Sequence, residues 1–216
     1  MEKENLMLLY KNLKTIMRDS LVVLLFTAIV GGGLYPLLIT GIAQVAFPFT
    51  ANGSIIEVNG VKYGSELLAQ QFSPVNDLEG KYLWGRAMNI SVFPVAGEDG
   101  ADLMYGGPAN LSPVSGDYEK LVKERVQQIR SVEAASANKN PVPQELVTVS
   151  GSGLDPDISP EAASYQVQRI SETRHIPASD VQKIINKYTE GRFLGIFGEP
   201  AVNVLKVNLA LDGILK

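Results

Sequence analysis

The longest apolar stretch lies close to the beginning of the chain. Residues 20–56 contain no Asp, Glu, Lys, Arg or His, and Leu21–Phe47 is apolar apart from Gly, Thr, one Pro and Gln44. At 1.5 Å per residue, these 27 residues form a helix of roughly 40 Å, which is longer than the ~30 Å hydrocarbon core of a bilayer. The pattern therefore predicts a transmembrane helix over residues 20–48 that crosses the membrane with tilt.

Two other interpretations of this stretch are less favoured. A cleaved signal peptide has an apolar region of about 7 to 15 residues and ends in an A-x-A-like site. The apolar run here is nearly twice as long, and Gln44–Pro48 offers no such site. A buried helix of a soluble protein rarely continues for 27 residues without a charge. We therefore expect a retained membrane anchor.

The charges that flank the apolar stretch predict its orientation. The basic residues before it are Lys3, Lys11, Lys14 and Arg18, and the only one in the 15 residues after Phe47 is Lys62. Positive residues stay on the cytoplasmic side of a membrane. We therefore expect residues 1–19 to be a cytoplasmic lead-in and residues 49–216 to form one extracytoplasmic domain.

The predicted span carries residues that are typical of helix packing in membranes. Glycines permit the close approach of a neighbouring helix, and a proline removes a backbone donor and bends the axis. A polar amide near the outer end lies at the interface or binds a partner helix. Membrane helices also simply tolerate Gly and Pro, but three consecutive glycines favour a packing surface. The candidate packing residues are Gly31, Gly32, Gly33, Tyr35, Pro36 and Gln44.

Patterns after the span predict an α+β domain, a small mixed sheet with helices packed on it. Asn59-Gly60 between Ser54–Val58 and Val61–Tyr63 predicts a β-hairpin with a type I′ turn. Further strands are expected over residues 82–86, 145–150 and 202–209, a short helix over 65–72, and a long structured loop over 87–116.

Three longer helices are expected in the second half of the domain. Residues 117–135 carry an apolar stripe and a Glu119–Lys123 pair at i,i+4. Ser159-Pro160-Glu161 predicts a capped helix start, and that helix continues to about Arg174. Ser179–Gln182 matches a capping box. The last helix has an apolar stripe at Val181, Ile184, Ile185 and Tyr188.

Composition excludes several classes of function. Of the 19 basic and 23 acidic residues, 4 and 3 precede the span, which leaves 15 against 20 and a net charge of about −5 on the outer domain. This charge argues against nucleic acid and anionic lipid as partners. The chain has no Cys, which excludes thiol catalysis and cysteine zinc sites, and His175 is its only His.

No catalytic constellation or metal site is predicted from the remaining motifs. His175 lies at a predicted helix C-terminus, where a capping role is favoured. Ser150–Gly153 lacks the glycine that precedes the serine in Gly-x-Ser-x-Gly, and Ser136–Lys139 matches Ser-x-x-Lys without its companion motifs. No Walker phosphate loop is present. Asp155 and Asp157 could touch a cation, although a turn before Ser159 is the favoured interpretation.

Several blocks in the correct order resemble the C subunit of the Kdp potassium-transporting ATPase. The blocks are Val147–Pro156, Ile158–Ala163, Gly198–Leu205 and Asn208–Leu211, together with Leu34–Leu37 and Thr40–Gln44 in the span. The resemblance covers roughly residues 34–212 and departs from the family at Asp157, Ala87-Met88 and Ala109–Val114. The family usually has His in place of Asp157.

The resemblance implies a non-catalytic accessory subunit in a prokaryotic plasma membrane. Its expected partners are a channel-like K⁺-translocating subunit, a P-type ATPase subunit and a small single-helix subunit. ATP and K⁺ would act through the complex, and the family is described as raising the ATP affinity of the catalytic subunit. The candidate residues for partner or nucleotide coupling are Ser150, Gly151, Ser152, Gly153, Leu154, Asp155 and Pro156.

An extracytoplasmic domain cannot touch cytosolic nucleotide, so any effect on ATP has to pass through the assembly as a coupling between distant sites. Two alternatives from other classes remain. One is a membrane-anchored serine hydrolase that uses Ser150 or Ser152. The other is an anchored ligand-binding sensor.

Overall fold

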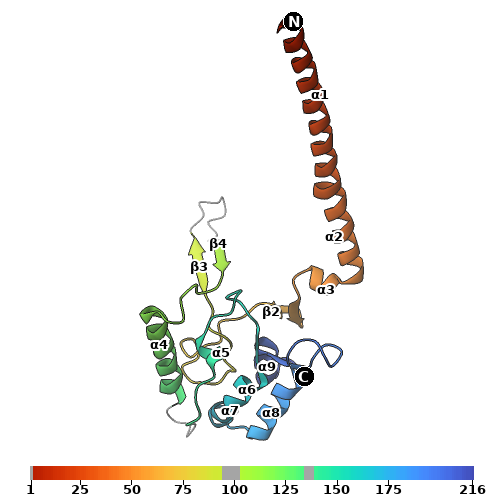
Figure 1. Ribbon diagram of the computed structural model, residues 1–216. Coiled ribbons are helices and arrows are strands. Elements are labelled where there is room, and N and C mark those ends of the chain that lie inside the picture. Colours follow the sequence, from red (N-terminus) through yellow and green to blue (C-terminus); the bar gives the residue numbers. More distant parts are fainter. Residues whose placement is uncertain (1, 94–102, 134–138) are drawn as a thin grey trace. The chain divides into compact units, whose positions relative to one another are not determined.

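The computed structural model describes residues 2–93, 103–133 and 139–216 (Figure 1). The chain divides into two compact units, one that ends at Ser54 and one that comprises Ile55–Lys216. The prediction of an α+β chain with one N-terminal apolar helix is confirmed.

The first unit is almost entirely helical. It contains α1 (Glu2–Ile29), a π-helical turn (Val30–Leu34), α2 (Tyr35–Ala46) and the short α3 (Pro48–Ala51). Within it, Tyr10–Ala46 is long and apolar enough to cross a membrane, and its most apolar part is exposed. The basic lead-in is therefore continuous with the helix that contains the apolar stretch.

The π-helical turn lies immediately before Pro36. A proline ring in a helix collides with the carbonyl group four residues earlier and leaves that carbonyl without its donor. Here the Tyr35 N–H donates to the Val30 carbonyl five residues back, which widens the turn at Gly31–Gly33. A Cβ added at any of these three glycines would meet no atom within 4 Å, so their side of the helix is open.

Gln44 has a hydrogen-bonding partner within the first unit. Its Oε1 accepts from Asn52 Nδ2 at 3.0 Å, and its Nε2 donates to Asn52 Oδ1 at 3.3 Å. Asn52 also donates to the carbonyl of Pro48 at 2.7 Å. Gln44 therefore fixes the turn after α2.

Among its described residues, the second unit carries three small antiparallel sheets together with several helices. The sheets are β1–β2, β3–β4 and a three-stranded sheet in the order β5-β7-β6. The strands are β1 (Ile55–Val58), β2 (Val61–Ser65), β3 (Ile90–Phe93), β4 (Leu103–Gly106), β5 (Asp157–Ile158), β6 (Thr189–Glu190) and β7 (Ala201–Asn203). The helices are α4 (Gly116–Val132), α5 (Gln144–Val147), α6 (Pro160–Tyr165), α7 (Val167–Arg174), α8 (Ala178–Lys187) and α9 (Val204–Leu211).

The core of this unit has three apolar clusters. The largest gathers side chains from α6 to α9 and β7 around Leu83, with Ile170, Val181 and Val207 fully buried. A second cluster surrounds Trp84 between α4 and α5. A third packs α9 against the β1–β2 hairpin. Leu83 and Trp84 are neighbours in the chain, so one short segment joins the two larger clusters.

Several local predictions are confirmed. Asn59 and Gly60 have φ of 53° and 79°, as a type I′ turn requires, and they connect β1 to β2. Ser159 caps α6 by accepting from the Ala162 N–H at 3.1 Å. Glu119 and Lys123 form the expected exposed ion pair on α4 at 2.5 Å. The stripe on α8 is also confirmed, since Val181 and Ile185 are buried.

Other predicted elements are wrong. No helix forms over 65–72, where β2 ends at Ser65 and irregular turns follow. Residues 144–147 form α5 in place of a strand, and residues 204–211 form α9, because only Ala201–Asn203 has a strand partner. The capping box is not used, since α8 begins at Ala178 after Pro177 with no side-chain cap.

The predictions for residues 82–116 are also revised. The expected loop over 87–116 contains the β3–β4 hairpin, in which Ile90 pairs with Gly106. Residues 82–86, the central segment, form no strand and pair with no strand among the described residues. The backbone groups of Leu83 and Trp84 in this segment are instead bound by side-chain amides.

These amides come from Asn208 and Gln166. Asn208 Oδ1 accepts from the Leu83 N–H at 2.7 Å, and its Nδ2 donates to the Leu83 carbonyl at 2.9 Å. Gln166 binds both backbone groups of Trp84 in the same way, at 2.8 and 3.0 Å. Because buried N–H and C=O groups need partners, the two amides replace the ladder of a neighbouring strand.

We expect Asn208→Ala to destabilise the domain by about 2–4 kcal/mol, because it leaves two buried backbone groups of Leu83 without partners. The chain has one Trp, Trp84, which is 1% exposed, so its fluorescence in denaturant reports unfolding of this unit in the full-length protein. Asn186→Ala on the exposed side of α8 is the control and should change stability by less than about 0.5 kcal/mol. Equal midpoints for the two variants would contradict the role of the amide.

Candidate functional site

The segment Ser150–Pro156 forms a tight turn that its own side chains hold. Ser150 Oγ accepts from the Gly153 N–H at 3.0 Å, and Ser152 Oγ accepts from the Leu154 N–H at 3.1 Å. The two hydroxyl oxygens lie 3.3 Å apart. Both serines therefore act as acceptors for the turn's backbone.

Gly153 is where this turn meets the base of the β3–β4 hairpin. Its φ is +72°, and a Cβ there would lie 2.4 Å from the Gly107 carbonyl oxygen and 2.9 Å from that of Asn89. The Gly153 carbonyl accepts from the Asn89 N–H at 3.2 Å. Only glycine combines this conformation with this close approach.

The second half of the turn reaches three other parts of the domain. The Leu154 carbonyl accepts from the Ala69 N–H at 2.9 Å, and the Pro156 carbonyl accepts from the Val204 N–H at 3.1 Å at the start of α9. Asp155 forms an ion pair with Arg86 at 3.2 Å. The turn is thus a junction between residues that are far apart in the chain.

Asp157, the next acidic residue, binds Asn203 on β7. Asn203 Nδ2 donates to Asp157 Oδ1 at 3.0 Å and to the carbonyl of Glu66 at 2.8 Å, while its Oδ1 caps α9 through the Lys206 N–H. Burial raises the pKa of Asp157 above its ordinary value, although the hydrogen bond from Asn203 acts in the opposite direction. Asp155 and Asp157 are therefore parts of a hydrogen-bonded turn, which was the favoured interpretation.

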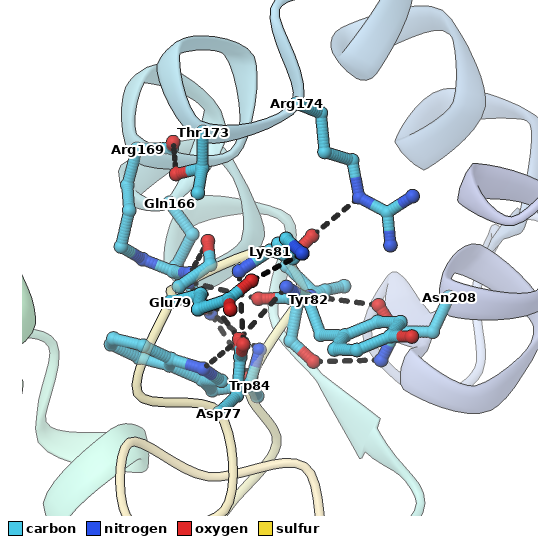
Figure 2. A network of polar contacts seen from close by, with 12 residues as sticks. Asp77, Glu79, Lys81, Tyr82, Trp84, Gln166, Arg169, Thr173, Arg174 and Asn208 are labelled. Atoms are coloured by element: carbon cyan, nitrogen blue, oxygen red, sulfur yellow. Dashed lines mark hydrogen bonds and ion pairs between the residues drawn. The ribbon is translucent and has the colours of Figure 1, made fainter.

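A second polar network lies around Trp84 (Figure 2). The guanidinium group of Arg169 stacks on the Trp84 ring, 3.4 Å from its centre, and lies 3.9 Å from Asp77. Asp77 accepts from Trp84 Nε1 at 2.9 Å and from the backbone N–H groups of Lys81 and Tyr82. The network thereby fixes the central segment, whose backbone Gln166 and Asn208 bind.

Arg169 in this network is a buried cation. Its exposed fraction is 4%, and burial lowers its pKa to about 10, although the charge of Asp77 acts in the opposite direction. The side chain therefore stays protonated at neutral pH, which suits its donation to the Tyr82 carbonyl at 3.0 Å and to Gln166 Oε1 at 2.7 Å. Its role is to hold the backbone of the segment.

A pocket of about 380 Å³ lies beside these two networks. Arg86 and Arg125 contribute cationic groups to its lining, and none of the described residues that line it is acidic. Arg125 donates to the Val147 carbonyl at 2.8 Å, and burial lowers its pKa. Two guanidinium groups without a carboxylate beside them among the described lining residues repel a cation such as K⁺.

The described residues provide no recognisable catalytic or metal site. Within the described residues, no hydrogen bond joins His175 to Ser150 or Ser152, and His175 occupies the left-handed C-cap of α7, as predicted, with φ of 55°. Across residues 2–93, 103–133 and 139–216, no three or more His, Cys, Asp or Glu side chains gather as metal ligands would. The Ser-x-x-Lys match at Ser136–Lys139 lies largely outside the described residues.

Sequence reasoning missed the residues that bind the Ser150–Pro156 turn and the central segment. Arg86, Gln166, Asn203 and Asn208 act across 46 to 125 residues of chain, so no local pattern predicts them. One hint was available, since Asn208 interrupts the apolar run Val204–Leu211 and such a polar residue in a buried helix needs a partner.

The sequence pattern of one protein family, described as K⁺-transporting ATPase, c chain, or KdpC, matches residues 17–213. The chain belongs to the KdpC family. This family assignment confirms the resemblance inferred from the sequence blocks, and the family's pattern includes the apolar helix as well as the second unit.

Individual KdpC relatives match along their whole length. The potassium-transporting ATPase KdpC subunit of Clostridium perfringens is 58% identical over 204 residues, which cover 94% of this chain and 100% of the relative. The protein of the same name from Clostridium botulinum is 51% identical over 206 residues, covering 95% and 100%. That of Dechloromonas aromatica is 41% identical over 204 residues, covering 94% and 100%.

We expect Gly153→Ala to destabilise the domain by about 2–4 kcal/mol, since it combines a left-handed φ with a backbone collision. Gly151→Ala in the same turn is the matched control, because its Cβ would meet no atom within 4 Å. Its stability should be unchanged or slightly raised. Trp84 fluorescence in denaturant measures both, and a tolerated Gly153→Ala would show that the contact with the hairpin is not needed.

Proposed function

We propose that the chain is a non-catalytic accessory subunit of an ATP-driven potassium uptake complex. It would assemble with a channel-like K⁺-translocating subunit, a P-type ATPase subunit and a small single-helix subunit. The observation that carries this proposal is the end-to-end match to relatives named potassium-transporting ATPase KdpC subunit. The structure supports it indirectly, because the polar side chains of the Ser150–Pro156 turn are engaged in holding the fold.

The proposed topology is a single membrane-spanning helix with a cytoplasmic N-terminus and an extracytoplasmic second unit. Support comes from the basic residues before the apolar stretch, among them Lys11 and Arg18. Within the membrane, the open side of Gly31–Gly33 is the proposed surface for a partner helix, since it would allow close backbone approach.

With this topology, the chain raises the ATP affinity of the catalytic subunit only by favouring one state of the whole assembly. Couplings of this kind typically change affinity by about 5–150-fold. ATP and K⁺ would then be ligands of the complex, and this chain would bind neither directly. The alternative is a membrane-anchored serine hydrolase, in which Ser150 or Ser152 would be the nucleophile.

The double variant Ser150→Ala/Ser152→Ala separates the two functions. As an accessory subunit, it should still co-purify with the P-type subunit and support K⁺-dependent ATP hydrolysis, because the hydrogen bonds of the lost hydroxyl groups lie within the turn. Loss of a hydrolytic nucleophile instead lowers activity by a factor on the order of 10³ or more. Complexes prepared without the chain should have a higher KM for ATP, and an unchanged KM and yield would contradict the proposal.

Cysteine labelling tests the topology, since the chain has no native Cys. Lys183 on α8 and Lys11 on α1 are both exposed and suitable for single substitutions. We expect Lys183→Cys to react with a membrane-impermeant maleimide in spheroplasts, and Lys11→Cys to react only after permeabilisation. The opposite pattern would invert the proposed orientation.

A further inference from the structure

One loop of the second unit exposes a run of large apolar side chains. Phe193, Leu194, Ile196 and Phe197 are between 62% and 74% exposed. They lie between β6 and β7, in the loop that extends beyond the helices near the C-terminus in Figure 1. Soluble surfaces rarely gather so many large apolar groups without a binding role.

The loop is ordered by its own hydrogen bonds. The Phe193 N–H donates to the Phe197 carbonyl at 2.8 Å, and the Phe197 N–H donates to the Phe193 carbonyl at 2.9 Å. At the base, Arg192 and Glu199 form an ion pair at 2.6 Å. The apolar side chains are thus presented on a pre-organised backbone, which lowers the entropy lost on binding.

The choice of leucine at position 194 of this loop does not favour the stability of the fold. The φ of Leu194 is 53°, in the left-handed region, where a bulky side chain is disfavoured and Gly or Asn is favoured. Its side chain is also 74% exposed, so it gains little from burial within the chain. Unfavourable conformations of this kind cluster at binding sites.

We propose that Phe193–Phe197, the apolar loop, docks onto an apolar protein surface of another subunit of the potassium-transporting complex. This inference rests on the proposed function and names the surface that the accessory subunit uses. Phenylalanine side chains on a rigid loop are typical anchors of protein interfaces.

The charges around the apolar loop favour a protein over a lipid bilayer. Elements that lie in a membrane interface carry Lys or Arg together with Trp or Tyr, whereas residues 190–200 contain one basic residue, Arg192, and it pairs with Glu199. The side chains of Glu190 and Glu199 are 81% and 77% exposed. Acidic groups at this place would be repelled by anionic lipid headgroups.

The loop is also connected directly to the Ser150–Pro156 turn. The strand that follows the loop, β7, ends at Asn203, which binds Asp157. The next residue, Val204, donates its N–H to the Pro156 carbonyl. A partner seated on the loop would therefore contact a part of the domain that is firmly tied to the core.

The direct test places the photo-crosslinking residue p-benzoylphenylalanine at Ile196 of the full-length chain, expressed with the other subunits of the complex. We expect a crosslink to one of those subunits, identified by mass spectrometry. The same residue at Lys183, exposed on α8, is the control and should give little product. Crosslinks to lipid only, or no crosslink in a chain that still co-purifies, would overturn the docking surface but leave the proposed function intact. A chain that never co-purifies with the ATPase would overturn both.

A variant separates binding from folding. Leu194→Asn/Ile196→Ser should keep or raise the midpoint of unfolding seen by Trp84 fluorescence, because Asn accepts the left-handed conformation. Its retention by the complex should fall by about tenfold or more, since anchor residues dominate interfaces. Asn186→Ala is the control and should be retained like the parent. Full retention of the double variant would overturn the proposal, and if the variant unfolds early, the crosslink at Ile196 decides.

Discussion

The fold of the second unit depends on how the backbone of Leu83 and Trp84 is satisfied. Both side chains of this central segment are almost completely buried, and no strand pairs with it among the described residues. Four buried backbone groups without partners would each cost about 1–3 kcal/mol. The amides of Gln166 and Asn208 bind all four of these groups. The segment can therefore lie between two apolar clusters without a neighbouring strand to pair with its backbone.

The position of the Ser150–Pro156 turn follows from this constraint. Beyond Trp84, the same segment places Arg86 against Asp155, and Ala87 forms a parallel bridge with Val149. The turn then contacts the β3–β4 hairpin through Gly153 and the start of α9 through Pro156. Because all of these contacts except the Arg86–Asp155 ion pair are made by backbone groups, the turn has little freedom to move independently of the core.

Turns and helix starts could be predicted from the sequence, whereas contacts between residues far apart in the chain could not. Asn59-Gly60 and the Ser159 cap were predicted correctly because a turn type and a helix start depend on a few adjacent residues. Residues 204–211 were misassigned because five of them are buried, and a helix that is apolar on most sides has no clear period. The strand predicted over 82–86 does not form, because the partners of Trp84 and Leu83 are side-chain amides 82 and 125 residues away.

The same limit applies to the candidate site. The Ser150–Pro156 block was found because it resembles a family, and the structure shows what its glycine does: Gly153 permits a contact that any side chain would block. The apolar loop was overlooked, although Phe193–Phe197 stands between Gly191 and Gly198 with no alternation of polar residues. Such a run fits neither a half-buried strand nor an amphipathic helix, and its exposure could be learned only from the fold.

An accessory subunit of the kind proposed above would influence a distant reaction only through the states of the assembly that it binds. To act in this way, the surfaces that contact different partners have to be rigidly connected within the domain. A flexible connection would let one surface move without changing the position of the other, so a change of state at one partner would not reach the next. In this domain, the apolar loop leads into β7, whose last residue, Asn203, binds Asp157 and caps α9. Helix α9 in turn binds the backbone of Leu83 through Asn208. Polar side chains therefore act inside the domain to hold its parts together, and the proposed docking of the apolar loop would be transmitted through these contacts to the centre of the domain.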